Sequence, residues 1–263
     1  MCYRKGYILL LLAIIFPWSA QAEMLFENSF ESGVINEQQQ WLIDSKKECS
    51  ITVDSSMARA GSSSARFESG SGARCEILPW FYSNFISRQL REPYDEDRWY
   101  AFSVYLEEDW EYNENNEVIA QWHASKDVFL KEPSGRGPPL ALRILGNVWR
   151  ITYGWDSDFR SKEGAKAIYP LWVGDIEPGK WTDWVFHVRW TRWGKDGLVQ
   201  VWKDDVMIAN YEGPIGYNDI RGNYLKLGSY HPRTERLVYI DEVRVGDEDE
   251  NYQTMKPHHN EQD

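Results

Sequence analysis

Short segments in which apolar and polar residues alternate recur along the chain, separated by turn-forming residues. Residues 140–145 and 148–155 are two such segments, and Gly146-Asn147 between them is a favourable hairpin turn. Residues 98–106 are apolar almost throughout, which indicates a strand buried on both faces. Because such segments return about every 8–15 residues and no long helical period appears, the sequence predicts an all-β sandwich of the jelly-roll type.

The same pattern places the remaining elements. Strands are expected at 23–33, 41–53, 64–68, 74–78, 118–123, 171–176, 181–190, 198–203, 224–229 and 237–245, with loops at 79–93, 109–117, 125–139 and 156–170. A short helix is expected near 83–89, and the loop 125–139, rich in Pro and Gly, is expected to form a groove wall or a lid. Because no linker or repeat interrupts residues 23–247, we predict one domain, followed by a frayed, polar tail at 248–263.

Polar side chains on three of these strands are candidates for chemistry. In a strand, residues i and i+2 point to the same face, so Gln121 and His123 stand side by side. Lys226 and Tyr230 are four residues apart and also share a face, and Arg74 opens the strand at 74–78. We expect these strands to be neighbours in one concave sheet, where a groove for an acidic sugar chain is lined by Arg74, Gln121, His123, Lys226 and Tyr230.

The charge of the chain limits its partners. The sequence has 29 Lys and Arg against 41 Asp and Glu, a formal net charge of −12. Without Arg4 and Lys5, which fall in a predicted signal segment, the balance is 27 − 41, or −14. This charge excludes nucleic acid as a partner. It also disfavours a polyanionic glycan unless basic residues gather in the groove, where screening over about 8–10 Å hides distant acids.

The N-terminus has the pattern of a cleaved signal peptide, residues 1–22. Arg4 and Lys5 precede an apolar run at 8–16, and Ala20-Gln21-Ala22 is a small-residue cleavage site. The apolar run is too short to span a bilayer, no second run follows it, and no Cys stands at the cut to carry a lipid. We therefore predict a secreted or periplasmic protein without a membrane anchor.

Cysteine and aromatic residues add two further expectations. Cys49 and Cys75 are the cysteines that follow the signal segment, and an oxidising compartment favours a disulfide between them. Two buried free thiols are the alternative. The chain also has 14 Trp and 15 Tyr, which suit either a β-sheet core or flat surfaces that stack on sugar rings.

Several longer segments resemble a known family. They are RAGSSSARFE (59–68), RCE (74–76), WYAFSVYL (99–106), IAQWH (119–123), GKWTDWVFHVRW (179–190), YLKLGSYH (224–231) and YIDEVRVGD (239–247). Together they resemble polysaccharide lyases of the heparin lyase I and glucuronan lyase type, over almost the whole chain after residue 22. The Gln-Trp-His and Lys-x-Gly-x-Tyr pieces carry the specific resemblance. The sequence departs from the family at Cys75, where a small polar residue is expected, and at His231, where a basic one is expected.

This resemblance implies a concanavalin A-like β-jelly roll that cleaves uronic-acid polysaccharides by β-elimination and leaves an unsaturated 4,5-uronate end. The reaction needs a base, an acid for the leaving oxygen, and groups that neutralise the uronate carboxylate. By similarity, His123 and Tyr230 share the acid and base roles, and Gln121 and Arg74 neutralise the carboxylate. Syn or anti elimination decides which of His123 and Tyr230 is the base, and the sequence leaves this open.

Further residues are predicted to bind ligands. The expected substrate-binding residues are Lys226, Trp122 and His231. The chemistry requires no cofactor, but Glu31 and Asp241 lie on the first and last strands, and hard oxygen ligands suit a structural calcium ion. Ordinary surface acids are the equal alternative there.

Two other functions stay open at this point. A non-catalytic carbohydrate-binding module of the same fold would keep groove aromatics without needing His123 or Tyr230. A concanavalin A-like glycoside hydrolase would need two carboxylates flanking the bond, and a strand-borne Glu-x-Asp-x-Glu spacing is absent. The sequence also leaves open the polymer (glucuronan, alginate or a heparin-like chain) and endo or exo action. We expect a monomer.

Overall fold

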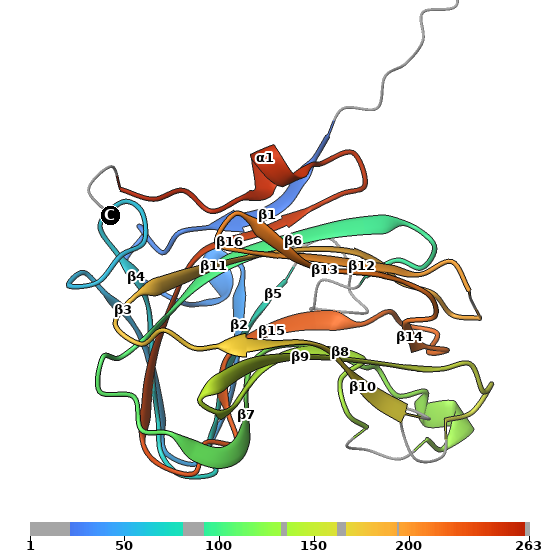
Figure 1. Ribbon diagram of the computed structural model, residues 1–263, viewed down its shortest axis with the longest axis horizontal. Coiled ribbons are helices and arrows are strands. Elements are labelled where there is room, and N and C mark those ends of the chain that lie inside the picture. The colour runs from blue at the N-terminus through green and yellow to red at the C-terminus, as the bar shows by residue number, and fades with distance from the viewer. Residues whose placement is uncertain (1–21, 81–91, 133–135, 162–166, 194, 261–263) are drawn as a thin grey trace, which may run out of the picture.

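The computed structural model describes residues 22–80, 92–132, 136–161, 167–193 and 195–260. Two β-sheets lie face to face as the layers of a sandwich (Figure 1). Sheet A contains β1 (Met24–Asn28), β3 (Cys49–Asp54), β4 (Ser64–Ser69), β6 (Asp97–Leu106), β11 (Trp181–Arg189), β12 (Leu198–Lys203), β13 (Val206–Glu212) and β16 (Arg236–Gly246). Sheet B contains β2 (Trp41–Lys46), β5 (Arg74–Pro79), β7 (Asn113–His123), β8 (Leu140–Gly146), β9 (Val148–Asp156), β10 (Ala167–Asp175), β14 (Gly216–Tyr217) and β15 (Tyr224–Tyr230).

The strand order brings distant parts of the sequence together. Sheet A has the order β13-β12-β11-β6-β16-β4-β3, with β1 on β16, and sheet B has the order β10-β9-β8-β7-β15-β5-β2, with β14 on β9. The pairs in the described residues are antiparallel except for β14 with β9. Short 3₁₀ helices lie at Glu37–Gln39 and Val128–Leu130. The predicted all-β sandwich is confirmed.

Large aromatic side chains from both sheets fill the space between them. Trp122 of sheet B lies 5.0 Å from Tyr100 and 4.8 Å from Phe186 of sheet A, measured between ring centroids. Trp149 of sheet B meets Trp184 of sheet A edge-on at 5.3 Å. Such aromatic pairs contribute about 0.5–1.5 kcal/mol each beyond the area that they bury. These aromatics therefore belong to the core.

Two strands differ from the prediction. β7 begins at Asn113, inside the expected loop 109–117, because Asn113 pairs with Gly146 at the end of β8. β13 was not expected at all. It follows β12 through Asp204 and Asp205, whose φ angles of 48° and 64° are left-handed, a conformation that aspartate tolerates in hairpin turns.

The C-terminal segment was predicted to be frayed, and this is wrong for its described part. A short helix, α1 (Tyr252–Met255), lies on the outer side of sheet A, beside β1 (Figure 1). The Asn251 side chain caps its first turn. Met255 is fully buried in a small cluster with Trp99 and Val185, so one apolar side chain fixes a segment that is otherwise polar.

Two predictions fall on residues that the structure does not describe. The expected helix near 83–89 lies within 81–91, and the expected signal peptide, 1–22, lies almost wholly within 1–21. Among the helices in the described ranges, none is both long and apolar enough to cross a membrane.

The predicted disulfide between Cys49 and Cys75 is present, with 5.4 Å between the Cα atoms. Cys49 lies on β3 in sheet A and Cys75 on β5 in sheet B, so the bond links the two layers. It also fixes the strand that carries Arg74. The two cysteines are 26 residues apart in the sequence, which sets the length of the loop that the bond closes.

Removal of this disulfide should destabilise the fold. We expect the double variant Cys49→Ser/Cys75→Ser to lose about 3 kcal/mol of unfolding free energy. Without the disulfide, the unfolded chain gains conformational entropy, which favours unfolding. Urea unfolding of the oxidised wild type and of the variant would measure the difference. A loss below about 1 kcal/mol would contradict a restraint of this size.

Candidate active site

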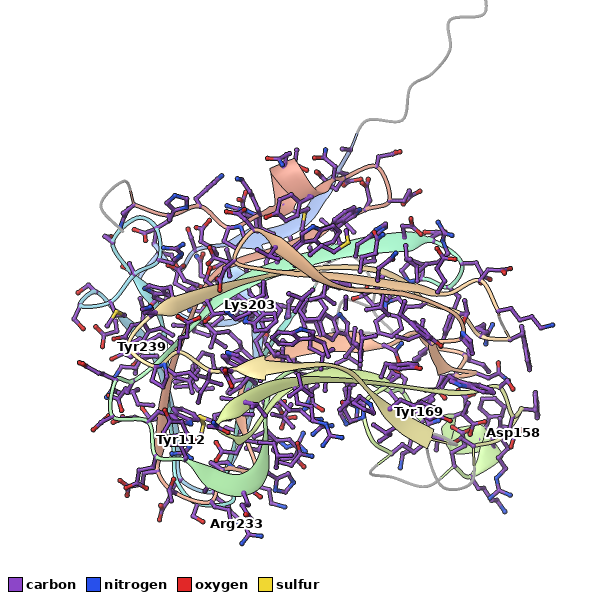
Figure 2. All side chains as sticks on the ribbon, in the orientation of Figure 1. Tyr112, Asp158, Tyr169, Lys203, Arg233 and Tyr239 are labelled. Atoms are coloured by element: carbon purple, nitrogen blue, oxygen red, sulfur yellow. A yellow bond between two sulfur atoms is a disulfide. The ribbon has the colours of Figure 1, made fainter. Side chains whose placement is uncertain are left out.

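A groove of about 570 Å³ runs over the outer face of sheet B. Its walls are formed by Ser71, Gly72, Arg74, Asn115, Asn116, Val118, Gln121, His123, Arg136, Gly137, Pro138, Arg143, Tyr230, His231, Pro232 and Arg233. We call it the sheet B groove. Figure 2 shows Arg233 on the side of the molecule opposite α1. The structure thus places the four candidate catalytic residues, Arg74, Gln121, His123 and Tyr230, along one surface.

Strand alternation and register explain this placement. On β7, Ala120 and Trp122 point into the core, whereas Gln121 and His123 point outward. β15 lies between β7 and β5. Its residue Tyr230 pairs with Arg74 on β5 at one end of the ladder, and Tyr224 pairs with His123 on β7 at the other.

A glycine makes close contact between β15 and β5 possible. Gly228 has φ 143°, and a Cβ atom there would overlap the backbone oxygen of Cys75. A side chain at this position would push the two strands apart. The Gly in the Lys-x-Gly-x-Tyr segment therefore fixes the spacing between the strands that carry Tyr230 and Arg74.

His123 is held as a neutral imidazole. Its Nδ1 lies 2.8 Å from the Ala124 carbonyl oxygen, which only accepts, so Nδ1 carries the proton and Nε2 keeps a lone pair. The hydroxyl of Tyr224 lies 3.1 Å from the same Nδ1. Burial lowers the pKa of His123 to about 4, and the positive charges of Lys226 and Arg74 act in the same direction. At neutral pH this side chain can accept a proton.

Tyr230 is packed between two other groove residues. The Arg74 guanidinium carbon lies 4.1 Å from the centroid of its ring, and the His231 ring centroid lies 3.9 Å away. Burial lowers the pKa of His231, as do the nearby charges of Arg74 and Lys47. His231 has φ 62°, and its backbone N–H donates to the Ala73 oxygen at 3.0 Å.

A network of charged side chains lies beneath the groove. Lys226 Nζ contacts Asp44 Oδ2 and lies 3.3 Å from Glu76 Oε2. Arg74 Nη1 lies 3.0 Å from Asp44 Oδ2 and 3.3 Å from Glu76 Oε2. Gln121 Nε2 donates to Glu76 Oε1, which fixes the orientation of the amide. Two positive and two negative charges thus support the groove residues.

Burial dominates the electrostatics of this network. Burial raises the pKa of Glu76, although Lys226, Gln121 and Arg74 each act to lower it. Asp44 is closer to solvent, with a side chain that is 40% exposed against 2% for Glu76. Its burial also acts to raise its pKa, but the hydrogen bond and charge of Lys226, together with Arg74, outweigh burial and lower it.

Two predicted substrate-binding residues do not line the groove. Trp122 is fully buried and points into the core, so the prediction that it contacts substrate is wrong. Its position between Gln121 and His123 in the strand forces it to the opposite face. Lys226 is 2% exposed, and its ammonium group is held by Asp44 and Glu76 under the groove floor. His231 does line the groove.

The candidate calcium ligands have other partners. Glu31 accepts hydrogen bonds from the backbone N–H groups of Ser62 and Ser63 at 2.9 and 3.0 Å. Asp241 accepts from the N–H groups of Arg59 and Glu242 at 2.8 and 2.7 Å, and burial raises its pKa to about 7. Because N–H groups point at these oxygens, the residues present do not form an oxygen cage for a cation. Both carboxylates fix the turn at 59–63.

The loop at 125–139 contributes to the groove wall through Arg136, Gly137 and Pro138, as expected for its described part. Arg136 is held by Asp219 through two hydrogen bonds of 2.7 and 2.8 Å and lies 3.4 Å from Glu132. Burial raises the pKa of Asp219 to about 6. This buried cluster fixes the wall in place.

The sequence analysis missed several groove features. Asp44 was not singled out, because its pairing with Lys226 depends on β2 and β15 both flanking β5. Arg136, Arg143 and Arg233 also line the groove. The signal for Arg143 was available in the alternation of residues 140–145, where it stands between two core residues, Leu142 and Ile144.

The profile of the family described as "Polysaccharide lyase" matches residues 30–244. The chain belongs to the polysaccharide lyase family. The resemblance seen in its sequence is therefore confirmed, and the chain is a polysaccharide lyase. No curated protein sequence matches it.

Solved structures of other proteins resemble this lyase in fold. An endo-β-1,4-glucuronan lyase from the fungus Trichoderma reesei superposes with a TM-score of 0.72 at 18% identity, covering 90% of this chain and 100% of its own. The cellulose-induced protein Cip1 gives a TM-score of 0.54 at 15% identity, covering 84% and 96%. A family 7 alginate lyase variant in complex with substrate gives 0.50 at 10% identity, covering 74% and 82%. The predicted jelly roll is confirmed.

The protonation of His123 leads to a prediction about pH. We expect its imidazole to titrate near pH 4, so that it stays neutral down to about pH 5. Because its pKa is lower in the folded lyase than in the unfolded chain, the unfolded chain binds the proton first. Part of the unfolding free energy is therefore lost as the pH falls from about 6.5 to about 4. An NMR titration of the His123 ring would measure the pKa, and a value of 6.5 or more would contradict this burial effect.

Proposed function

We propose that this lyase cleaves a uronic-acid polysaccharide by β-elimination and leaves an unsaturated 4,5-uronate end. One observation carries the proposal. Four arginines, Arg74, Arg136, Arg143 and Arg233, line the sheet B groove, and among its described lining residues there is no Asp or Glu. The chain as a whole has a net charge of −12. A basic groove in an acidic protein supports an anionic substrate in spite of the net charge.

The groove residues divide the proton transfers between them. His123, neutral and with a lone pair on Nε2, takes the proton from C5 of the uronate. The electron pair of the C5–H bond forms the C4=C5 double bond, and the C4–O bond breaks. A phenol donates its proton to the departing oxygen, so the charges balance. Tyr230 on the groove wall is the first candidate for this acid, and Tyr224, whose hydroxyl lies 3.1 Å from His123 Nδ1, is the second.

The uronate carboxylate must be neutralised before C5 becomes acidic enough. The Nη1 atom of Arg74 contacts both Asp44 and Glu76. The other N–H groups of this guanidinium can bind a carboxylate through two parallel hydrogen bonds. Gln121 uses one N–H of Nε2 on Glu76 and keeps a second. We assign both residues to the carboxylate, where donors stabilise the charge that develops in the transition state.

Two further observations support this function over hydrolysis. A glycoside hydrolase of the usual kind needs two carboxyl groups flanking the scissile bond, and the described lining of the groove supplies none. The structurally similar enzymes include a glucuronan lyase and an alginate lyase, both named for uronate polymers. With the N-terminal segment acting as an export signal, the substrate would be a polymer outside the cytoplasm.

The test is the ultraviolet absorbance of a conjugated, unsaturated uronate. The lyase would be mixed with glucuronan, alginate and heparin, and with carboxyl-reduced glucuronan as the neutral control. We expect absorbance to rise with at least one uronate polymer and not with the neutral one. New reducing ends without absorbance would establish hydrolysis and overturn the proposal.

A further inference from the structure

One row of side chains crosses sheet B at a single register. Arg74 on β5 pairs with Tyr230 on β15, Tyr230 with Val118 on β7, and Val118 with Arg143 on β8. Arg143 then pairs with Arg150 on β9. Directly paired residues share a face of the sheet. The row therefore runs along the outer face, perpendicular to the strands, and carries positive charge at both ends.

The two ends of the row differ in how their charge is balanced. Arg74 has Asp44 and Glu76 as partners. Arg143 donates to the Thr152 hydroxyl at 3.2 Å, and in the part of the chain that the structure describes it has no ion pair. The Nε atom of Arg150 is buried with no hydrogen-bond partner among the described residues. This end of the row carries two positive charges, and neither has a carboxylate partner among the described residues.

This arrangement is unfavourable in the absence of a ligand. Like charges directly opposite each other on neighbouring strands destabilise a sheet. Burial lowers the pKa of Arg143, and the charge of Arg150 lowers it further. A buried guanidinium donor without an acceptor also costs free energy. A bound anion would remove all three penalties, because one carboxylate can accept hydrogen bonds from both side chains.

We propose that Arg143 and Arg150 form a second anion-binding subsite, which binds the carboxylate of a uronate next to the one that is cleaved. The substrate class rests on the proposed function. Neighbouring strands are about 4.8 Å apart, so Arg143 lies about two strand spacings from Tyr230 along the row, and Arg150 about three. This distance separates the pair from the reacting sugar. A sugar chain laid across the strands therefore meets Arg74 and Tyr230 first and the two arginines further along.

The subsite predicts a loss of binding that depends on the ligand's charge. The variants are Arg143→Gln and Arg150→Gln, alone and together, made in a His123→Ala background so that no turnover occurs. Arg66→Gln is the matched control, since Arg66 lies on β4 of sheet A and carries the same charge. Calorimetric titration would use glucuronan and alginate oligosaccharides, and the carboxyl-reduced glucuronan oligosaccharide as the neutral probe.

We expect each arginine variant to bind the preferred anionic oligosaccharide about 10- to 100-fold more weakly, which is the range for a hydrogen bond to a charged group. Binding of the neutral probe should change less than twofold, and Arg66→Gln should bind like its parent. Thermal unfolding without ligand separates binding from folding. Arg150→Gln should be at least as stable as its parent, because a repulsion is removed.

The outcomes distinguish this subsite from the proposed function. Arginine-dependent binding without any unsaturated product would keep the subsite and overturn elimination. Unsaturated product from the wild type, with binding unchanged in the double arginine variant, would keep elimination and overturn the subsite. A neutral probe weakened as much as the anionic one, or an Arg150→Gln protein less stable than its parent, would show a structural role and also overturn the subsite.

Discussion

Tyr230→Phe is expected to lower kcat for β-elimination by about 10²- to 10⁴-fold, the usual contribution of a positioned acid or base. The change removes one oxygen and keeps the ring that packs against Arg74 and His231. The groove should therefore keep its shape and its affinity. The rate of unsaturated uronate formation, measured by ultraviolet absorbance at saturating polymer, checks the expectation.

His123→Ala should cause a loss of similar size, because it removes the proton acceptor. Tyr105→Phe is the control for loss of a phenol, since Tyr105 lies on β6 of sheet A. Equal activity in Tyr230→Phe and Tyr105→Phe would remove Tyr230 from the chemistry and assign the acid to Tyr224, whose hydroxyl lies 3.1 Å from His123 Nδ1. If Tyr230→Phe and His123→Ala both formed unsaturated product at the wild-type rate, elimination would be kept and the active site would have to lie elsewhere.

The sequence predicted the faces of the strands well. Period-two alternation placed Gln121 and His123 outward, and the structure has both in the groove. Alternation is a local property, so it holds wherever a strand forms. The same rule puts Trp122 on the opposite, core face, and the prediction that Trp122 binds substrate disregarded it. The local physics was the better guide there.

Strand pairing and its consequences were harder to predict. The bond of Lys226 to Asp44 needs residues 182 positions apart in sequence to meet across β5, and alternation carries no information about such pairs. The Arg143–Arg150 pair needed only the hairpin at Gly146-Asn147, which was predicted. Counting residues back from that turn would have placed the two arginines opposite each other. The tail at 248–263 was misjudged because a single buried side chain, Met255, outweighs its polar composition.

The network under the groove explains how an acidic protein can hold a basic surface. Asp44 and Glu76 form ion pairs with Lys226 and Arg74, so the charges of these two carboxylates are already balanced by cations. The groove itself is left with arginines and without described acids. The other acidic residues lie outside this lining, and salt screens those that are more than about 8–10 Å from the bound ligand.

Lys226→Met is expected to lower the unfolding free energy by about 3 kcal/mol, because it leaves a buried charge without its partner. Lys226 and Glu76 are each 2% exposed, and Arg74 stays as a second cation at 3.3 Å from Glu76, which puts the cost at the lower end of the range. Elimination should also slow, since Glu76 orients the amide of Gln121. Urea unfolding and the absorbance assay measure the two effects.

Two comparison variants make the Lys226 prediction specific. Lys180→Met breaks an exposed pair with Glu177, whose side chains are 71% and 52% exposed, and should cost about 0–1 kcal/mol. Adding Glu76→Gln to Lys226→Met should recover part of the stability, because no uncompensated carboxylate remains while the glutamine can still bond to Gln121. The charge of Lys226 also lowers the pKa of His123, so Lys226→Met should move the titration of His123 upward from about 4. If Lys226→Met cost no more than Lys180→Met and left the His123 titration in place, Lys226 would not stabilise the groove, and the low pKa of His123 would be due to burial and Arg74.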